Sequence, residues 1–163
     1  MAESERGLSP NDVYPILLTN LKDAQVVVVG GGAVGERKII GLLGVKARVR
    51  LISPQATSHL RELADAGEIE WIQRNYQMGD LVNAKLGFAA TDQRDINAQV
   101  ALEAKELDLL CNVADQPDEG NFYLPAVYRD GELVVAVSTA GKSPAQARIF
   151  RNKIAEWLAN RRI

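Results

Sequence analysis

Three glycines at the spacing G-x-G-x-x-G are the residues of this sequence that most clearly point to chemistry. Gly30, Gly32 and Gly35 follow a run of four valines, and an apolar helical pattern follows them. At this spacing the first glycine permits a tight turn, the second lets backbone amides approach a pyrophosphate, and the third lets a helix pack closely on a strand. Because strand, loop and helix come in the required order, we predict a dinucleotide site. The alternative is a tight strand–helix turn that binds nothing.

The segment after the second expected strand bears on which dinucleotide would bind. Most dinucleotide-binding domains carry Asp or Glu there, where the carboxylate holds the adenosine ribose. This chain instead has Ser53, Pro54 and Gln55. A serine hydroxyl or a glutamine amide can still bond to the ribose, and no basic residue of this loop could pair with a 2′-phosphate. The sequence therefore favours NAD over NADP.

Asp115 lies just beyond the fifth expected strand, where the nicotinamide end of a cofactor would lie. A carboxylate at that place could act as a general base or orient a substrate. The alternative is an ordinary turn aspartate ahead of Pro117. We interpret the nearby Asp118 and Glu119 as solvated loop charge, and we expect no metal site here.

The segment 142–163 is basic, although the whole chain has a net charge of −2. It contains one acidic residue, Glu156, and six basic ones: Lys142, Arg148, Arg151, Lys153, Arg161 and Arg162. Hydroxyls, a helix start and cations come together between residues 138 and 148. They predict a carboxylate-binding surface made of Ser138, Thr139, Lys142, Ser143 and Arg148. The alternatives are simple helix capping and a solvated helix face.

Strand and helix patterns alternate over the first 113 residues. We expect strands at 26–29, 47–52, 69–72, 86–90 and 109–113, and helices at 34–43, 57–66 and 92–107, the last capped by Asp92. Short connections predict a Rossmann-type α/β fold, a doubly wound parallel sheet with strand order 3-2-1-4-5. Loops after its strands then meet at one edge. The residues that we expect to contact the cofactor there are Gly30, Gly31, Gly32, Ala33, Val34, Gly35, Ser53, Pro54, Gln55, Thr91 and Asn112.

The pattern changes after residue 120. Two β-rich runs, 122–128 and 133–138, flank Asp130-Gly131, which is a strong hairpin-turn signal. Ser143, Pro144 and Gln146 then form a helix start. We expect this C-terminal hairpin and helix to pack on the sheet and on a partner subunit. The predicted organisation is a flexible tail over 1–13, a dinucleotide-binding domain over 14–120 and a dimerisation and substrate-binding appendage over 121–163.

Composition narrows the class of protein. A chain of 163 residues with 47% hydrophobic residues can build one domain with a core, and no apolar run approaches the ~18 residues of a membrane span. The polar N-terminus shows no signal-peptide pattern. The single cysteine, Cys111, excludes an internal disulfide and fits the cytoplasm, and with one histidine it excludes a His/Cys metal cluster in one chain. The net charge gives no attraction to nucleic acid, so we expect neither a nucleic-acid nor a membrane partner.

With these residues in view, the chain resembles the precorrin-2 dehydrogenase family, the N-terminal module of sirohaem synthases. The matching segments recur in family order over Tyr14–Leu158: YPILLTNL, VVGGGAVGERK, LISP, AATD, CNVAD, NFYLPA, VAVSTAGKSPAQAR and a basic helix. The resemblance implies NAD-dependent oxidation of precorrin-2 to sirohydrochlorin by a homodimer. It implies NAD contacts at 31–34, 53–55 and Thr91, and a catalytic role for Asp115. The polycarboxylate tetrapyrrole would give the basic C-terminal element a ligand.

Two other functions stay open from the sequence. Some related proteins also insert ferrous iron and often carry a further helical segment; the sequence given ends at Ile163, which puts chelatase activity in doubt more than dehydrogenation. A non-catalytic NAD-sensing Rossmann module is the other alternative. Such modules commonly keep the acid after the second strand, and they have no need of the CNVAD loop or the basic segment.

Overall fold

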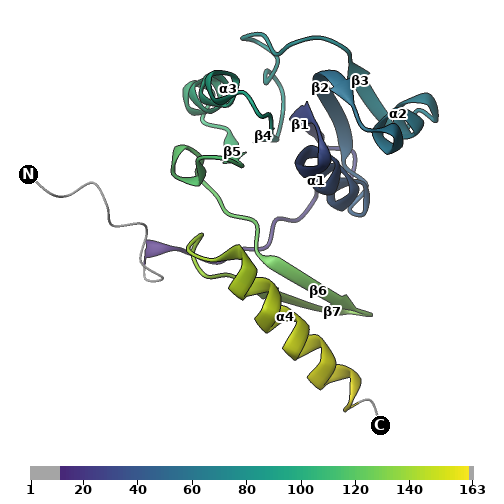
Figure 1. The fold of residues 1–163 in the computed structure, drawn as a ribbon, viewed down its shortest axis with the longest axis vertical. Coiled ribbons are helices and arrows are strands. Elements are labelled where there is room, and N and C mark those ends of the chain that lie inside the picture. Colours follow the sequence, from purple (N-terminus) through teal and green to yellow (C-terminus); the bar gives the residue numbers. More distant parts are fainter. Residues whose placement is uncertain (1–11, 162–163) are drawn as a thin grey trace, which may run out of the picture. The chain divides into compact units, whose positions relative to one another are not determined.

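The computed structural model describes residues 12–161, and its secondary structure is shown in Figure 1. The chain divides into two compact units. The first unit is Leu17–Phe122, and the second gathers residues 12–16 and 123–161 of the described part. Most of the predicted flexible tail, residues 1–11, lies outside the described residues.

A five-stranded parallel sheet forms the centre of the first unit. Its strands are β1 (Gln25–Gly31), β2 (Arg48–Ala56), β3 (Ile69–Ile72), β4 (Leu86–Ala89) and β5 (Leu110–Val113). Their order is β3-β2-β1-β4-β5, which confirms the predicted doubly wound topology. The connecting helices are α1 (Ala33–Leu43), α2 (Ser58–Asp65) and α3 (Arg94–Glu106), and a short 3-10 turn, η2 (Pro117–Glu119), follows β5.

The valine run of β1 supplies both faces of the sheet. Val26 and Val28 pack in a core with α1 and α2, whereas Val27 and Val29 pack in a second core with α3. All four side chains are at most 1% exposed. Full burial of a valine side chain stabilises a fold by roughly 1.5–3 kcal/mol. This run therefore fixes β1 at the middle of the sheet, with its last residues at the edge where the glycine turn begins.

The second strand is longer than predicted. β2 continues through Ser53–Gln55, which were expected to end it, and closes at Ala56. The register with β1 shifts from Val29 opposite Ile52 to Gly31 opposite Ala56, so β2 accommodates extra residues as a bulge. The bulge buries Ser53 and leaves the next two residues exposed.

The predicted Asp92 cap of α3 is wrong. α3 begins at Arg94, and Gln93 occupies the capping position without a side-chain hydrogen bond. The hydroxyl of Thr91 accepts a hydrogen bond from the Gln93 amide at 3.1 Å, so the turn before α3 is organised by Thr91 instead. Asp92 is left exposed.

A buried carboxylate fixes the irregular segment 73–85 against α3. Glu103 is 3% exposed and accepts hydrogen bonds from the amides of Gly79 (3.0 Å) and Leu81 (3.1 Å). It also accepts one from the Tyr76 hydroxyl, and burial next to this carboxylate raises the pKa of Tyr76. Backbone amides that β-pairing leaves free are thus satisfied by a side chain.

The second unit contains a β-hairpin and one helix. β6 (Ala126–Asp130) pairs antiparallel with β7 (Leu133–Val137), and α4 (Pro144–Ala159) packs on both strands. Asp130 lies opposite Leu133, so the two-residue turn is Gly131-Glu132, one residue later than the predicted Asp130-Gly131. Gly131 has a φ of +56°, which a glycine at the first turn position adopts without strain.

The start of α4 agrees with its sequence pattern. Ser143 caps the helix, and its hydroxyl accepts a hydrogen bond from the Gln146 amide at 3.3 Å. The apolar residues of α4 differ in burial. Ala147 is buried, whereas Phe150 is 49% and Trp157 is 53% exposed. Within residues 12–161, no helix combines the length and the apolar character that a membrane span requires.

Candidate dinucleotide and catalytic site

Close backbone packing shapes the glycine turn at the end of β1. Gly30 has a φ of +114°, and a Cβ placed on it would lie 2.4 Å from the carbonyl oxygen of Ala90, just after β4. A Cβ on Gly35 would lie 2.0 Å from the carbonyl oxygen of Gly30. Any side chain at either position would therefore separate the turn from β4 or α1 from β1. The first and third glycines of the motif bring three backbone segments together.

The middle of the motif is open. Gly32, Ala33 and Val34 are exposed at the beginning of α1, and a Cβ on Gly32 would meet no atom within 4 Å. The first amides of a helix have no partners within the helix and carry its positive dipole end. This arrangement can hold a phosphate or pyrophosphate.

Ser53 supports the turn rather than facing outward. Ser53 is only 8% exposed, and its hydroxyl accepts a hydrogen bond from the Gly31 amide at 3.0 Å. Its carbonyl accepts one from the Trp71 indole at 2.9 Å. The hydroxyl and the Gly31 amide therefore satisfy each other, and Pro54 and Gln55 are the exposed residues of the bulge. Of the predicted ribose contacts, these two are the accessible ones.

A carboxylate from α1 reaches the residue after β2. Glu36 accepts a hydrogen bond from the Thr57 hydroxyl, and its second oxygen lies 3.3 Å from Nδ1 of His59. The Thr57 bond is the main cause that lowers the pKa of Glu36. The sequence pattern offered no acid on β2, and this acid was missed because it belongs to another element.

Asn97 organises the loop after β4 and was missed in the sequence. It is fully buried on α3, and its side-chain oxygen accepts from the amide (3.1 Å) and the hydroxyl (2.7 Å) of Thr91. Its nitrogen donates to the Thr91 carbonyl at 3.0 Å. Thr91 therefore has a fixed position at the sheet edge. A polar residue within the apolar stripe of α3 was the signal that could have revealed Asn97.

Asp115 follows β5 and is paired with a cation. Arg94, the first residue of α3, donates from Nη1 to Oδ2 of Asp115 at 2.9 Å and from Nη2 to Glu119. Burial tends to raise the pKa of Asp115, but hydrogen bonds from Arg94 and Asn97 outweigh it and the pKa is lowered. Asp115 is accordingly a stable anion. Arg94 was missed in the sequence because it contacts Asp115 only where the loops after β4 and β5 lie next to each other in the folded chain.

Asn112 is occupied by neighbours within the same unit. Its side-chain oxygen accepts a 2.6 Å hydrogen bond from Nζ of Lys38, and its nitrogen donates to the Phe122 carbonyl at 3.0 Å. Burial lowers the pKa of Lys38 to about 8. Asn112 was expected to contact the cofactor, and in the structure its buried amide holds the chain where it leaves β5.

The predicted carboxylate-binding residues belong to the hairpin unit. The Ser138 hydroxyl accepts from the Ala140 amide at 3.1 Å, and the Thr139 hydroxyl accepts from the Ser143 amide at 2.9 Å. These hydroxyls therefore shape the turn that precedes α4. Lys142 and Arg148 are exposed.

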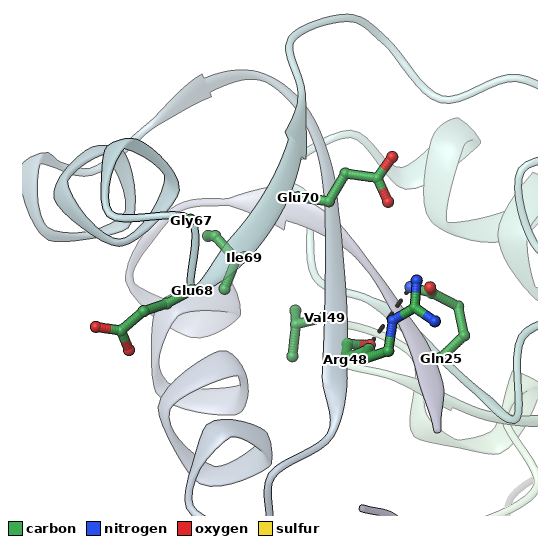
Figure 2. Close-up of a pocket in the computed structure, with 7 residues that line it drawn as sticks. All are labelled: Gln25, Arg48, Val49, Gly67, Glu68, Ile69 and Glu70. Atoms are coloured by element: carbon green, nitrogen blue, oxygen red, sulfur yellow. Dashed lines mark hydrogen bonds between the residues drawn. The ribbon is translucent and has the colours of Figure 1, made fainter. Parts of the chain in front are cut away.

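A shallow pocket lies at the opposite, amino-terminal edge of the sheet (Figure 2). Its lining residues are Gln25, Arg48, Val49, Gly67, Glu68, Ile69 and Glu70. The Gln25 amide donates to the Arg48 carbonyl across it at 3.4 Å. None of the predicted site residues lines this pocket.

Comparisons with known proteins agree with this geometry. A family model described as "Putative NAD(P)-binding" matches residues 17–126, and one described as "Sirohaem biosynthesis protein central" matches residues 130–156. Siroheme synthase 1 of Aeromonas salmonicida (strain A449) is 37% identical over 143 residues, which are 88% of this chain and 30% of that protein. The siroheme synthase of Stutzerimonas stutzeri (strain A1501) is 39% identical over 145 residues, 89% of this chain and 31% of that protein.

This chain therefore spans about a third of the length of these curated relatives. Among solved structures, SirC, a precorrin-2 dehydrogenase, matches with a TM-score of 0.75 and 30% identity. That match covers 91% of this chain and 70% of SirC. NAD is the cofactor that the matched NAD(P)-binding domain and this neighbour support. The chain belongs to the precorrin-2 dehydrogenase and sirohaem synthase N-terminal module family, and its role is in sirohaem biosynthesis.

Proposed function

We propose that this protein oxidises precorrin-2 to sirohydrochlorin and passes the hydride to NAD. The observation that carries the proposal is a shared sheet edge. The open start of α1, the fixed Thr91 turn and the Asp115 carboxylate follow β1, β4 and β5, which are neighbours in the sheet. Parallel strands collect ligand-binding loops at this edge, near the switch between β1 and β4. Bound NAD would supply the hydride acceptor.

The residues of this chain would divide the work as follows. The exposed amides at Gly32–Val34 would hold the pyrophosphate, and the exposed Pro54 and Gln55 would contact the ribose. Precorrin-2 carries many carboxylates, which the exposed Lys142 and Arg148 would bind. Oxidation removes one hydride and one proton from the macrocycle. Asp115 would orient the macrocycle or receive the proton, and water is the other acceptor.

We also propose that the protein works as a cytoplasmic homodimer. The hairpin unit exposes several large apolar side chains, and a two-stranded sheet alone is marginally stable. The exposed ones on β7 and α4 are Leu133, Val134, Ile149, Phe150 and Trp157. A second copy of the same surface would cover them. The single, buried Cys111 is consistent with a reducing compartment.

Asp115→Asn tests the proposed role of the carboxylate. We expect unchanged NAD affinity and melting temperature, and a precorrin-2 turnover slower by roughly 10²–10⁴-fold, the usual effect of losing a general base. The matched control is Asp108→Asn, because Asp108 is an exposed acid at the far end of α3 with a φ of +51° that Asn tolerates. Asp115→Asn with wild-type turnover would remove Asp115 from the mechanism.

A further inference from the structure

We infer that Arg94 is a positioning residue for the proposed oxidation, because its guanidinium clamps Asp115 at the end of β5 and keeps it in one place as an anion. The inference rests on the proposed function and adds a residue to it. Arg94 matches no motif in the sequence. Neither Arg94 nor the residues that it contacts are part of the glycine motif.

The geometry of the clamp is specific. Arg94 uses two nitrogens on two carboxylates: Nη1 donates to Asp115 at 2.9 Å, and Nη2 donates to Glu119 of η2. These partners lie 21 and 25 residues along the chain. A guanidinium presents several donors in one rigid plane, so it can fix two carboxylates relative to each other. One side chain of α3 thus determines the course of the loop that follows β5.

A second residue near the start of α3 holds the loop after β4. Asn97 lies one turn after Arg94. The same Asn97 binds the amide, hydroxyl and carbonyl of Thr91. The first turns of α3 therefore link the loop after β4 to the loop after β5. The charged groups that face Asp115 are Arg94 of α3 and, through Arg94, Glu119 of η2.

Stability alone is a poor reason for Arg94. The side chains of Arg94, Asp115 and Glu119 are 42%, 35% and 39% exposed. Ion pairs with this exposure contribute little to folding, with a median of about 0–1 kcal/mol. A cation at the first position of a helix is also opposed by the helix dipole. The helix dipole therefore disfavours Arg94 at this position. The effect of Arg94 there is to fix the positions of two carboxylates.

The clamp decides what Asp115 can do. Of the two roles proposed for Asp115, pairing with Arg94 favours that of a fixed negative charge over that of proton acceptor, because the pairing makes the carboxylate a weak base. NAD, when bound, would accept the hydride, and the macrocycle would then carry a positive charge. The clamped carboxylate stabilises this charge, in the way that preorganised charges stabilise transition states. A proton then leaves the oxidised macrocycle to water, which completes the balance.

The test compares Arg94→Gln and Arg94→Lys with the wild type. The matched control is Arg50→Gln, because Arg50 also forms an exposed ion pair, 2.8 Å from Glu70, on a different part of the sheet. One readout is the pKa of the Asp115 carboxyl, followed by carbon NMR and assigned with Asp115→Asn. The other is the acid limb of kcat/KM for precorrin-2 oxidation.

We expect Arg94→Gln to raise the pKa of Asp115 toward the value of a carboxyl with no cation beside it. The acid limb of kcat/KM should move to higher pH with it, and turnover should fall at every pH below the new limb. Arg94→Lys should restore part of both shifts, because it keeps a charge but loses the two-pronged geometry. Arg50→Gln should change neither.

Three results would overturn the inference, and each has a different meaning. If the wild type is active but Arg94→Gln leaves both the acid limb and the Asp115 pKa unchanged, the positioning role of Arg94 is refuted and the proposed function stands. A uniform loss of rate across pH with a lower melting temperature assigns Arg94 to folding. A wild type that binds NAD but leaves precorrin-2 unchanged refutes the proposed function, and the positioning role is lost with it.

Discussion

Substitutions at Gly32 and Gly35 should separate the binding role of the glycine turn from its packing role. A Cβ at Gly32 would point into open space, with no atom within 4 Å, and its φ of −82° suits any residue. A Cβ at Gly35 would lie 2.0 Å from the Gly30 carbonyl oxygen, which is backbone and cannot rotate away. Alanine is the smallest change that places this one carbon at each position.

For Gly32→Ala we expect a free energy of unfolding within about 0.5 kcal/mol of the wild type. Alanine caps a helix less well than glycine, and it also reduces the entropy of the unfolded chain, so the two effects nearly cancel. NAD should nevertheless bind at least about tenfold more weakly, a loss of about 1.4 kcal/mol, because the carbon fills space that the pyrophosphate needs. Gly32→Val should abolish binding.

For Gly35→Ala we expect the opposite pattern in stability. α1 must move away from β1 by about an ångström, and overpacking of this kind costs roughly 1–3 kcal/mol. Better helix propensity returns about 0.5–1 kcal/mol. The net loss of about 1 kcal/mol would lower the melting temperature by about 2–4 °C for a chain of this size.

The assay is calorimetric titration with NAD, repeated with NADP, and thermal unfolding of the same preparations. NADP should bind more weakly than NAD to the wild type, since Pro54 and Gln55 offer no charge for a 2′-phosphate. Wild-type NAD affinity in Gly32→Val would refute the assignment of the pyrophosphate to this turn. Unchanged stability of Gly35→Ala would refute the packing argument.

Two further predictions concern other parts of the chain. Burial lowers the pKa of Lys38 from 10.5 to about 8, so between these values the unfolded state binds more protons at this residue, and its contribution to stability should rise with pH there. Lys38→Met should remove that contribution from the urea midpoints, and an identical pH dependence in both proteins would contradict it. Trp157→Glu should convert the proposed homodimer to a monomer, because it would place a charge in the apolar surface. Light scattering should then give a mass near 17.8 kDa for the variant, and a wild-type mass of 17.8 kDa at micromolar concentration would rule out the dimer.

The sheet could be predicted from the sequence because its signals are local. The valine run before Gly30, together with the alternation of strands and helices, determines the topology and the edge at which Thr91 and Asp115 meet. The cap at Ser143 was equally readable, because its partner Gln146 lies only three residues away. Short-range hydrogen bonds and periodic burial can be predicted because they depend on residues that are close together in the sequence.

Contacts between distant segments could not be predicted in this way. The bulge that buries Ser53 depends on the register between β1 and β2, and the residues alone do not specify it. Arg94 reaches Asp115 across 21 residues, and Lys38 reaches Asn112 across 74. The burial of the apolar residues of α4 depends on how far the hairpin covers the helix, and this left Phe150 and Trp157 exposed.

The most direct test of the proposed function is the yield of NADH from a known amount of precorrin-2. The purified protein is given precorrin-2 and excess NAD without oxygen, and the absorbances of NADH and sirohydrochlorin are recorded together. We predict one NADH for each sirohydrochlorin formed, with no product when NAD is left out. Binding of NAD without any sirohydrochlorin, or sirohydrochlorin without NADH, would contradict the proposed oxidation.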